Sequence, residues 1–322
     1  MYDQILKALF EANSCKTDKE EIAYLNGLKP SAQQLWDAYQ NQAVKVSYAD
    51  SNIRAAYLLR YFPPYTQLIQ QVLLGVDRNA LKTLNQTSIK ACFFGAGPAP
   101  ELYGFLRFLK RSHPRAKSVD AHLYDVSRDD WQFALEINRR TLIPQFWNSL
   151  RTLTVKFDIA KPRAIQLGGQ VRGTLQLSDI VVFQNCLNEV PPSSRGVLRA
   201  NLRQLVGAMK MGAILVVIER KGYAAVDTVL ADIRGDVEAS STAVLLGKPN
   251  EARYFNCVST YSTMPKILTD NLFLRKSSRT PPPPEESGLI LGRDIKYRAL
   301  IVAKKDKGSH GDSPQRAEDL PF

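Results

Sequence analysis

The sequence predicts an α/β protein in which a helical N-terminal region precedes a mostly parallel, doubly wound sheet. Three observations lead to this prediction: helix signals fill residues 1–86, apolar strands alternate with helices from residue 89 onward, and the strands are rich in β-branched residues. Strands of this kind are expected where helices cover both faces of a parallel sheet. With 322 residues and a hydrophobic fraction of 44%, the chain has enough apolar material for a large core.

The N-terminal region carries several helix boundaries. Thr17 and Ser31 each precede a Glu or Gln by three residues, which is the spacing of a capping box. Pro63 and Pro64 end one helix and begin another, because proline lacks the N–H that a helix interior needs. We therefore expect residues 1–86 to form a helical region.

The remaining elements follow in alternation. The expected strands are KACFFGAG at 90–97, VDAHLYDV at 119–126, TLTVKFDI at 152–159, DIVVFQNCL at 179–187, GAILVVIER at 212–220 and IKYRALIVAKK at 295–305. Helices are expected at 100–110, 129–141 and 194–209. The stretch 222–262 is expected to hold a helix and an inserted strand at 252–259, followed by a helix at 264–273 and a strand near 272–275. We expect one domain over 87–305 and a solvated tail over 306–322.

Composition limits the classes of function. The net charge of +12 favours an anionic partner, and RNA is the partner we expect. The four cysteines include no C-x-x-C pair and only three histidines occur, so neither a metal site nor histidine-based catalysis is expected. The sequence contains neither a signal peptide nor an apolar stretch of about 20 residues, so we expect no membrane partner and a reducing cytoplasmic or organellar-matrix compartment.

A glycine-rich bend follows the first predicted strand. Gly95 and Gly97 lie between apolar Phe94 and a helix that begins near Pro100, so backbone can approach a ligand closely and the helix offers free N–H groups. Such a bend suits a ligand that contains a nucleoside. The dinucleotide fingerprint needs a small residue where Pro100 stands, which disfavours a nicotinamide or flavin enzyme.

Polar residues end the next three strands. Asp125 comes 28 residues after Gly97, at a position where a carboxylate can accept hydrogen bonds from both ribose hydroxyls. Asp158 ends the third strand, where it can hold an adenine amino group, and Asn185 and Cys186 end the fourth, beside the reacting group. Each aspartate has an alternative interpretation as a cap of the following turn.

These segments resemble a known family. FFGAGPAPE, HLYDVS, KFDIA, VVFQNCLNEVPP and GAILVVIER are similar to the successive motifs of class I, Rossmann-like S-adenosylmethionine-dependent methyltransferases, over residues 87–305. The resemblance implies a seven-stranded sheet with an antiparallel last strand. The turn at 95–98, Asp125 followed by Trp131, and the pair Asn188 and Glu189 also resemble features of methyltransferases directed at ribosomal RNA. The segment AYLLRYFPPY at 56–65 resembles the helical segment before the core in methyltransferase-like proteins of mitoribosome assembly.

The resemblance also implies the cofactor, S-adenosylmethionine, and the residues that hold it. These are Gly95, Ala96, Gly97, Ala99, Glu101, Asp125, Val126, Asp158, Ile159, Asn185 and Cys186. Two departures stand out: Phe93 replaces the family's usual acidic residue, and Ala99 replaces its third glycine. Glu101 either supplies the missing negative charge to the cofactor's amino group or only complements the helix dipole.

Candidate catalytic residues follow the fourth strand. Glu189 is the carboxylate there that could act as a general base, and Asn185 or Asn188 could orient an acceptor. The alternative is that Asn188 and Glu189 belong to a turn that leads into the next helix.

Two further groups of residues have both a functional and a structural interpretation. Tyr57, Tyr61, Phe62 and Tyr65 lie at helical spacing, which suits either base stacking or core packing. The sequence also contains two groups of basic residues. The first comprises Arg107, Lys110, Arg111, Arg115 and Lys117. The second, which is the better candidate for phosphate contact, comprises Arg275, Lys276, Arg279, Arg293, Lys296 and Arg298.

The sequence therefore predicts an S-adenosylmethionine-dependent methyltransferase, with RNA as the expected acceptor. The alternatives are a methyltransferase acting on a small molecule or a protein, and a non-catalytic RNA-binding or assembly protein that keeps the fold. The sequence gives no prediction of oligomeric state.

Overall fold

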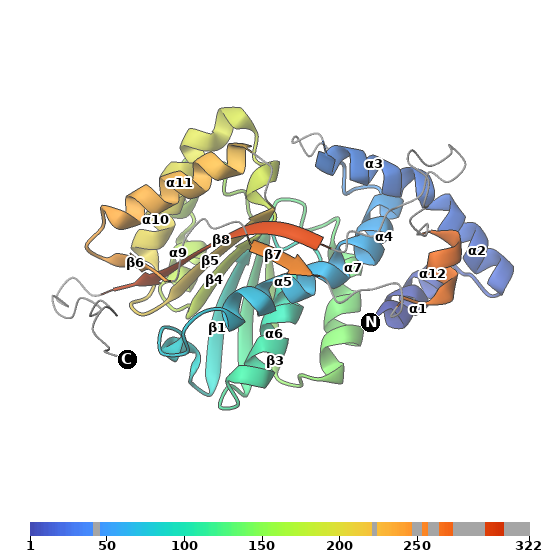
Figure 1. Ribbon diagram of the computed structural model, residues 1–322, viewed down its shortest axis with the longest axis horizontal. Coiled ribbons are helices and arrows are strands. Elements are labelled where there is room, and N and C mark those ends of the chain that lie inside the picture. Colours follow the sequence, from blue (N-terminus) through green and yellow to red (C-terminus); the bar gives the residue numbers. More distant parts are fainter. Residues whose placement is uncertain (41–45, 221–223, 247–252, 257–263, 273–293, 306–322) are drawn as a thin grey trace, which may run out of the picture.

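The computed structural model describes residues 1–40, 46–220, 224–246, 253–256, 264–272 and 294–305. A twisted sheet forms the centre of the molecule, and helices cover both of its faces (Figure 1). The strands are β1 (Ser88–Phe94), β2 (Ser118–Asp125), β3 (Leu150–Lys156), β4 (Ile180–Gln184), β5 (Ile214–Arg220), β6 (Ala243–Leu245), β7 (Arg253–Asn256) and β8 (Asp294–Lys304).

The strand order confirms the predicted Rossmann-like fold. The order is β3-β2-β1-β4-β5-β8-β6, and β7 also pairs with β8. The first five strands in this order are parallel, whereas β8 runs antiparallel to β5. Phe94 lies opposite Tyr124 on one side and Phe183 on the other, so β1, β2 and β4 reach their carboxyl ends at similar heights. The loops after these strands therefore emerge side by side.

The outermost part of the sheet adds a detail to this fold. Two short strands share the length of β8: Leu245 of β6 pairs with Val302, and Arg253 of β7 pairs with Tyr297. In the part of the chain that the structure describes, the sheet thus has eight strands where seven were expected, because β6 and β7 share the sixth position. Of the strand expected near 272–275, Leu272 directly follows a helix, and residues 273–275 lie outside the described residues.

Alternation along the strands divides the core between the two faces of the sheet. On β1, Ala91 and Phe93 belong to the core cluster shared with the N-terminal helices, whereas Cys92 and Phe94 belong to the cluster on the opposite face. This period of two follows from strand geometry. The covering of both faces explains why the strands are apolar almost throughout.

The N-terminal region is helical, as expected. It comprises α1 (Tyr2–Ala12), α2 (Asp18–Gly27), α3 (Lys29–Gln40), α4 (Ser51–Arg60) and α5 (Phe62–Leu74). Thr17 caps α2 in a capping box with Glu20, which confirms that prediction. The second predicted box is wrong, because α3 begins at Lys29 and Ser31 already lies within its first turn.

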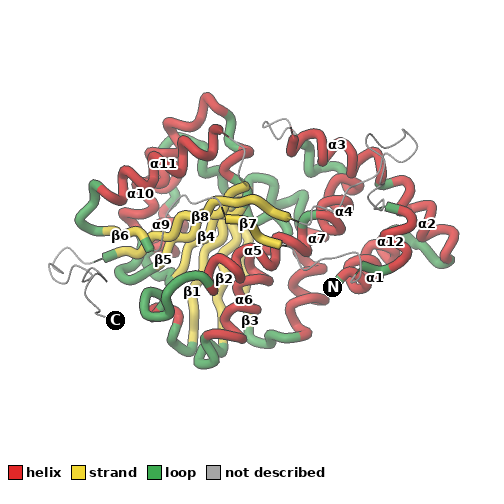
Figure 2. The backbone as a smooth tube through the Cα atoms, in the orientation of Figure 1, coloured by secondary structure: helices red, strands yellow, loops and turns green. Residues whose placement is uncertain are grey.

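The later helices are α6 (Pro100–Ser112), α7 (Gln132–Glu136) with a π-helical continuation (Ile137–Leu142), α8 (Ala164–Leu167), α9 (Gly169–Leu175), α10 (Arg195–Ala208), α11 (Ala224–Glu238) and α12 (Lys266–Asn271). Short 3₁₀ turns lie at Lys82–Leu84, Ile143–Gln145, Leu187–Glu189 and Pro192–Ser194. The backbone tube shows α12 lying beside α2, although it comes far later in the chain (Figure 2). None of the described helices is long and apolar enough to span a bilayer.

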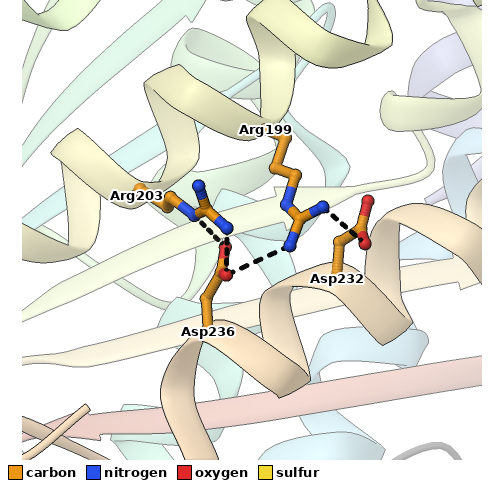
Figure 3. Close-up of polar contacts among 4 residues, drawn as sticks. All are labelled: Arg199, Arg203, Asp232 and Asp236. Atoms are coloured by element: carbon orange, nitrogen blue, oxygen red, sulfur yellow. Dashed lines mark hydrogen bonds and ion pairs between the residues drawn. The ribbon is translucent and has the colours of Figure 1, made fainter. Parts of the chain in front are cut away.

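Ion pairs join α10 to α11 (Figure 3). Arg199 contacts Asp232 at 3.0 Å and Asp236 at 3.3 Å, and Arg203 contacts Asp236 at 2.5 Å. The pairing holds the pKa of Asp236 below its usual value, chiefly through the hydrogen bond from Arg203. These side chains are partly exposed, so solvent screens the network and its contribution to stability is modest.

The N-terminal helices pack directly against the sheet domain. A Cβ atom on Gly104 of α6 would lie 1.9 Å from the carbonyl oxygen of Thr66 in α5, so only glycine permits this contact. The buried core on this face is continuous from Ile5 through Leu68 to Phe105 and Val182. The N-terminal helices therefore help to position the edge of the sheet at which the loops emerge.

Candidate functional site

A cavity of about 560 Å³ opens at the carboxyl ends of β1, β2, β3 and β4. This volume lies within the usual range for small-molecule sites. Ten of the eleven predicted cofactor residues line it: Gly95, Ala96, Gly97, Glu101, Asp125, Val126, Asp158, Ile159, Asn185 and Cys186. The sequence prediction that these residues share one crevice is therefore correct in its geometry.

The bend after β1 needs both of its glycines. Gly95 has φ +63° and Gly97 has φ +49°, in the left-handed region that glycine tolerates. A Cβ atom on Gly95 would lie 2.3 Å from Cβ of Cys186, so the bend packs directly on the loop after β4.

Ala99 is the exception among the predicted cofactor residues. It is fully buried, has φ +57°, and is not among the residues that line the cavity. Its carbonyl oxygen instead accepts a hydrogen bond of 2.8 Å from Asn138 Nδ2 at the start of α6. Ala99 is thus the one predicted cofactor residue that lies outside the cavity lining, because its left-handed backbone turns the chain into the helix.

Asp125 joins the first two loops. Its Oδ2 accepts a hydrogen bond of 2.7 Å from the Gly97 N–H, and its Oδ1 accepts one of 2.7 Å from the Ser127 N–H. Burial raises the pKa of Asp125, while these two backbone hydrogen bonds oppose that shift. An ionised carboxylate has about four acceptor positions, so two remain for a ligand. The neighbouring Val126 lines the cavity and is 55% exposed.

The loop after β3 is fixed by backbone contacts. Asp158 Oδ1 accepts a hydrogen bond of 2.9 Å from the Ala160 N–H. The carbonyl oxygen of Ile159 accepts one of 2.7 Å from Asn201 Nδ2 on α10. Asp158 therefore serves its own turn, which was the structural interpretation, and it lines the cavity as well.

The loop after β4 depends on a buried acid that sequence reasoning missed. Glu219, the penultimate residue of β5, is fully buried, and its Oε1 accepts hydrogen bonds from the N–H groups of Cys186 at 2.9 Å and Leu187 at 2.7 Å. Burial raises the pKa of Glu219 to about 8. Asn185 precedes this loop with φ +54°. The signal in the sequence was an acid at the end of an otherwise apolar strand.

Two of the three candidate catalytic residues line the cavity. Glu189 and Asn185 line the cavity, whereas Asn188 is buried and is not among the lining residues. Asn188 and Glu189 do belong to a 3₁₀ turn, as the alternative interpretation held. Glu189 Oε1 nevertheless accepts a hydrogen bond of 3.1 Å from the Tyr48 hydroxyl. Burial raises the pKa of Glu189 to about 7, with Asp125 as the second cause.

Glu101 and Phe93 clarify the departure from the family motif. Phe93 is fully buried in the core, with its ring 6.1 Å from that of Phe105, so it does not face the cavity. Glu101 lines the cavity, is 3% exposed, and has no hydrogen-bond partner for Oε1 in the described part of the chain. Burial raises its pKa well above the usual value. A buried carboxyl without a partner is costly unless a ligand complements it.

An aromatic wall, made of Tyr48, Tyr57 and Trp131, closes one side of the cavity. The ring of Tyr48 lies 4.6 Å from that of Trp131, and the ring of Tyr57 lies 5.1 Å from it. Of the tyrosine stripe predicted on the N-terminal helices, Tyr57 thus reaches the site, whereas Tyr61 and Tyr65 are buried and do not line it.

The described members of the two basic groups do not line the cavity. Arg107 and Lys110 are on the half of α6 remote from the cavity, where both contact Phe146. Of the second basic group, Lys296 and Arg298 are described, and Arg298 forms an ion pair of 2.9 Å with Asp227. The other four members lie outside the described residues. Within the described chain, no cluster of three or more His, Cys, Asp or Glu side chains is arranged to hold a metal ion.

Comparisons with known proteins give structural matches alone. No family model matches the sequence, and no curated protein matches it. The chain is similar to the DszA carbon methyltransferase (13% identity over 86% of this chain and 65% of that chain; TM-score 0.41). It is also similar to the CurJ carbon methyltransferase (12% identity over 74% of this chain and 53% of that chain; TM-score 0.38).

A third similar structure is the 16S rRNA (adenine(1408)-N(1))-methyltransferase from Catenulisporales acidiphilia (14% identity over 71% of this chain and 91% of that chain; TM-score 0.36). The chain spans about half of the CurJ methyltransferase and 65% of the DszA methyltransferase. At TM-scores this low the fold assignment rests on the strand order and register described above. The resemblance to mitoribosome-assembly proteins stays a prediction.

Proposed function

We propose that this protein is an S-adenosylmethionine-dependent methyltransferase. The observation that carries the proposal is the cavity at the carboxyl edge of the sheet, where the glycine bend, Asp125 and the ends of β3 and β4 meet. Ligands of doubly wound sheets bind at this edge. The bend admits backbone approach, and Asp125 keeps free acceptor positions for ribose hydroxyls.

The charge of the cavity supports a cationic nucleoside. Burial raises the pKa of Cys186 well above its usual value, and Glu219, Glu189, Glu101 and Asp125 all add to that shift, so four carboxyl groups lie near this thiol. Lys161 is the one lysine or arginine among the described residues that line the cavity. A bound sulfonium or ammonium favours the ionised forms of these carboxyls, whose pKa values burial otherwise raises. A dinucleotide pyrophosphate gains no such attraction from them.

Each side of the cavity has a role under this proposal. Gly95 and Gly97 flank the methionine part of the cofactor, and Glu101 pairs with its ammonium group. Asp125 holds the ribose, while Asp158 and the apolar Ile159 flank the adenine. When bound, the cofactor supplies a methyl group on a positively charged sulfur. The protein's own contribution is orientation, exclusion of water and electrostatic complementarity.

RNA as the acceptor is the finer part of the proposal. The net charge of +12 supports it, because phosphate contacts dominate affinity for RNA. Binding to a structured RNA should weaken steeply between about 50 and 200 mM salt. Salt-independent or absent RNA binding would favour the alternative, a small molecule or a protein as acceptor.

Calorimetry with S-adenosylmethionine and S-adenosylhomocysteine tests the core of the proposal. We expect both compounds to bind with micromolar dissociation constants. In Asp125→Ala the affinity should fall at least about tenfold, because the ribose loses charge-assisted hydrogen bonds. Asp129→Ala is the matched control: Asp129 lies on the same loop, is exposed, and does not line the cavity. If the folded protein binds neither compound, the proposal fails and a non-catalytic role for the fold is favoured.

A further inference from the structure

The β4 side of the cavity is rich in unused hydrogen-bond acceptors. Gln184 Nε2 donates to the Tyr65 carbonyl oxygen at 3.1 Å, which fixes the orientation of the amide, and Gln184 Oε1 has no partner in the described chain. The amide of Asn185, 6% exposed, has no partner among the described residues for either polar atom. Glu189 adds a carboxyl whose hydrogen bond from Tyr48 occupies one oxygen position. Buried polar groups left without partners are rare in proteins, so the amides of Gln184 and Asn185 point to a ligand, next to which Glu189 places a carboxyl.

The surroundings of these acceptors select the kind of ligand. The aromatic wall of Tyr48, Tyr57 and Trp131 faces the same cavity, and aromatic faces attract cations. Lys161, the one lysine or arginine that the structure describes in the cavity lining, follows β3 on the adenine side. Oxygen acceptors, a carboxyl and aromatic rings together favour a ligand that brings several N–H donors or a positive charge.

We propose, on the premise of the methyltransferase function above, that the acceptor atom is a nitrogen of an amine or amino group, bound by Gln184, Asn185 and Glu189 beside the aromatic wall. A nitrogen with two or three N–H bonds can satisfy several of these acceptors at once, whereas a hydroxyl donates once. A carboxylate or phosphate would meet two amide oxygens and a carboxyl, with Asn185 Nδ2 as the one unpartnered donor group among these three side chains.

Glu189 also gives the reaction a place for the proton. An ammonium must lose a proton before its nitrogen can attack, and the Glu189 carboxylate can take that proton. The nitrogen lone pair then forms the N–C bond while the C–S bond breaks and its electron pair remains on the sulfur. The pKa of Glu189, raised by burial to about 7, suits a base that works near neutral pH. The proton afterwards leaves to water.

Three probes of similar size test the inference: benzylamine, benzyl alcohol and benzoate. Each is titrated by calorimetry at pH 8 into protein saturated with S-adenosylhomocysteine. We expect benzylamine to bind at least about tenfold more tightly than benzyl alcohol, because a buried charge-assisted contact outweighs a neutral one, and benzoate to show no binding. Glu189→Gln should abolish the preference for the amine while S-adenosylhomocysteine still binds. Glu238→Gln, on the exposed side of α11, should change nothing.

The outcomes separate the two proposals. If S-adenosylhomocysteine binds but the amine and the alcohol bind equally, or benzoate binds best, or none of the probes binds, the nitrogen-acceptor inference is overturned and the methyltransferase proposal stands. If S-adenosylhomocysteine itself fails to bind, the proposed function fails first. An amine preference that survives Glu189→Gln would also contradict the assignment of this carboxyl.

Discussion

Single buried carboxyls dominate the chemistry of the cavity at the scale of the residue. Burial raises the pKa of Glu189 to about 7 and that of Glu219 to about 8, from an ordinary value of 4.5. Between 4.5 and these values the folded protein binds protons that the unfolded chain does not bind. The free energy of unfolding therefore falls as pH rises through this interval and levels off above it.

This sign gives a prediction for Glu189→Gln. The variant should match the parent protein near pH 4.5 and exceed its free energy of unfolding by up to about 3 kcal/mol at pH 8, since each pKa unit corresponds to about 1.4 kcal/mol. The groups that face Glu189 are Asp125, whose charge adds to the shift, and Tyr48 and Tyr39, whose hydroxyls oppose it. Urea denaturation at several pH values measures the difference. A constant difference across the pH range would contradict the assigned pKa.

Gly95 allows a second prediction at this scale. Gly95→Ala combines a left-handed φ with a Cβ atom 2.3 Å from Cβ of Cys186, so it should lower the free energy of unfolding by about 2 kcal/mol or more. Gly235→Ala in α11 is the control, because nothing lies within 4 Å of its added Cβ and alanine favours helix; it should stabilise the protein by about 0.5–1 kcal/mol. Chemical denaturation of both variants measures these changes. An unchanged free energy of unfolding in Gly95→Ala would contradict the prediction.

At the scale of the element, two helix pairs differ in what holds them. The α5–α6 pair meets at the backbone through Gly104, whereas the α10–α11 pair is joined at its surface by the ion pairs of Figure 3. Gly104→Ala should lower the free energy of unfolding by about 1–3 kcal/mol or more, because a backbone oxygen cannot move aside.

Asp236→Asn should cost much less, and its effect should shrink further in high salt, since screening already weakens exposed pairs. Thermal denaturation of both variants at low and high salt makes the comparison. A salt-sensitive Gly104→Ala, or an Asp236→Asn variant that is the less stable of the two, would contradict this assignment of forces.

The sequence predicted the features that depend on local signals and missed those that depend on contacts between distant residues. Apolar β-branched strands and the glycine bend gave the sheet and its functional edge, because these signals are local. Tyr48 could not be placed, since its hydrogen bond with Glu189 joins residues 141 positions apart. Glu219 was missed because a charged residue at a strand end usually faces water, whereas here it binds the backbone of a neighbouring loop. That Ala99 lies outside the cavity lining could not be predicted, because a motif position does not reveal its backbone conformation.

For the whole molecule, cofactor binding should appear as added stability. A ligand at 100 times its dissociation constant adds about 2.7 kcal/mol to the free energy of unfolding, because it binds the folded state alone. We expect S-adenosylhomocysteine to raise the melting temperature of the parent protein by several degrees, and to do so far less for Asp125→Ala. Differential scanning fluorimetry with Asp129→Ala as control measures the shift. Equal shifts in all three proteins would show that Asp125 does not contact the ligand.

The path of the chain through the sheet has a consequence for biosynthesis. After β7 the chain forms α12, which packs against α2 in the N-terminal region. The last strand, β8, then lies between β5 on one side and β6 and β7 on the other. During translation β8 emerges from the ribosome after all the other described strands, although it is the strand that connects β5 to β6 and β7 in the sheet. Until β8 arrives, the nascent chain carries an open, apolar edge along β5, which is the kind of edge that chaperones shield and that aggregates when unshielded.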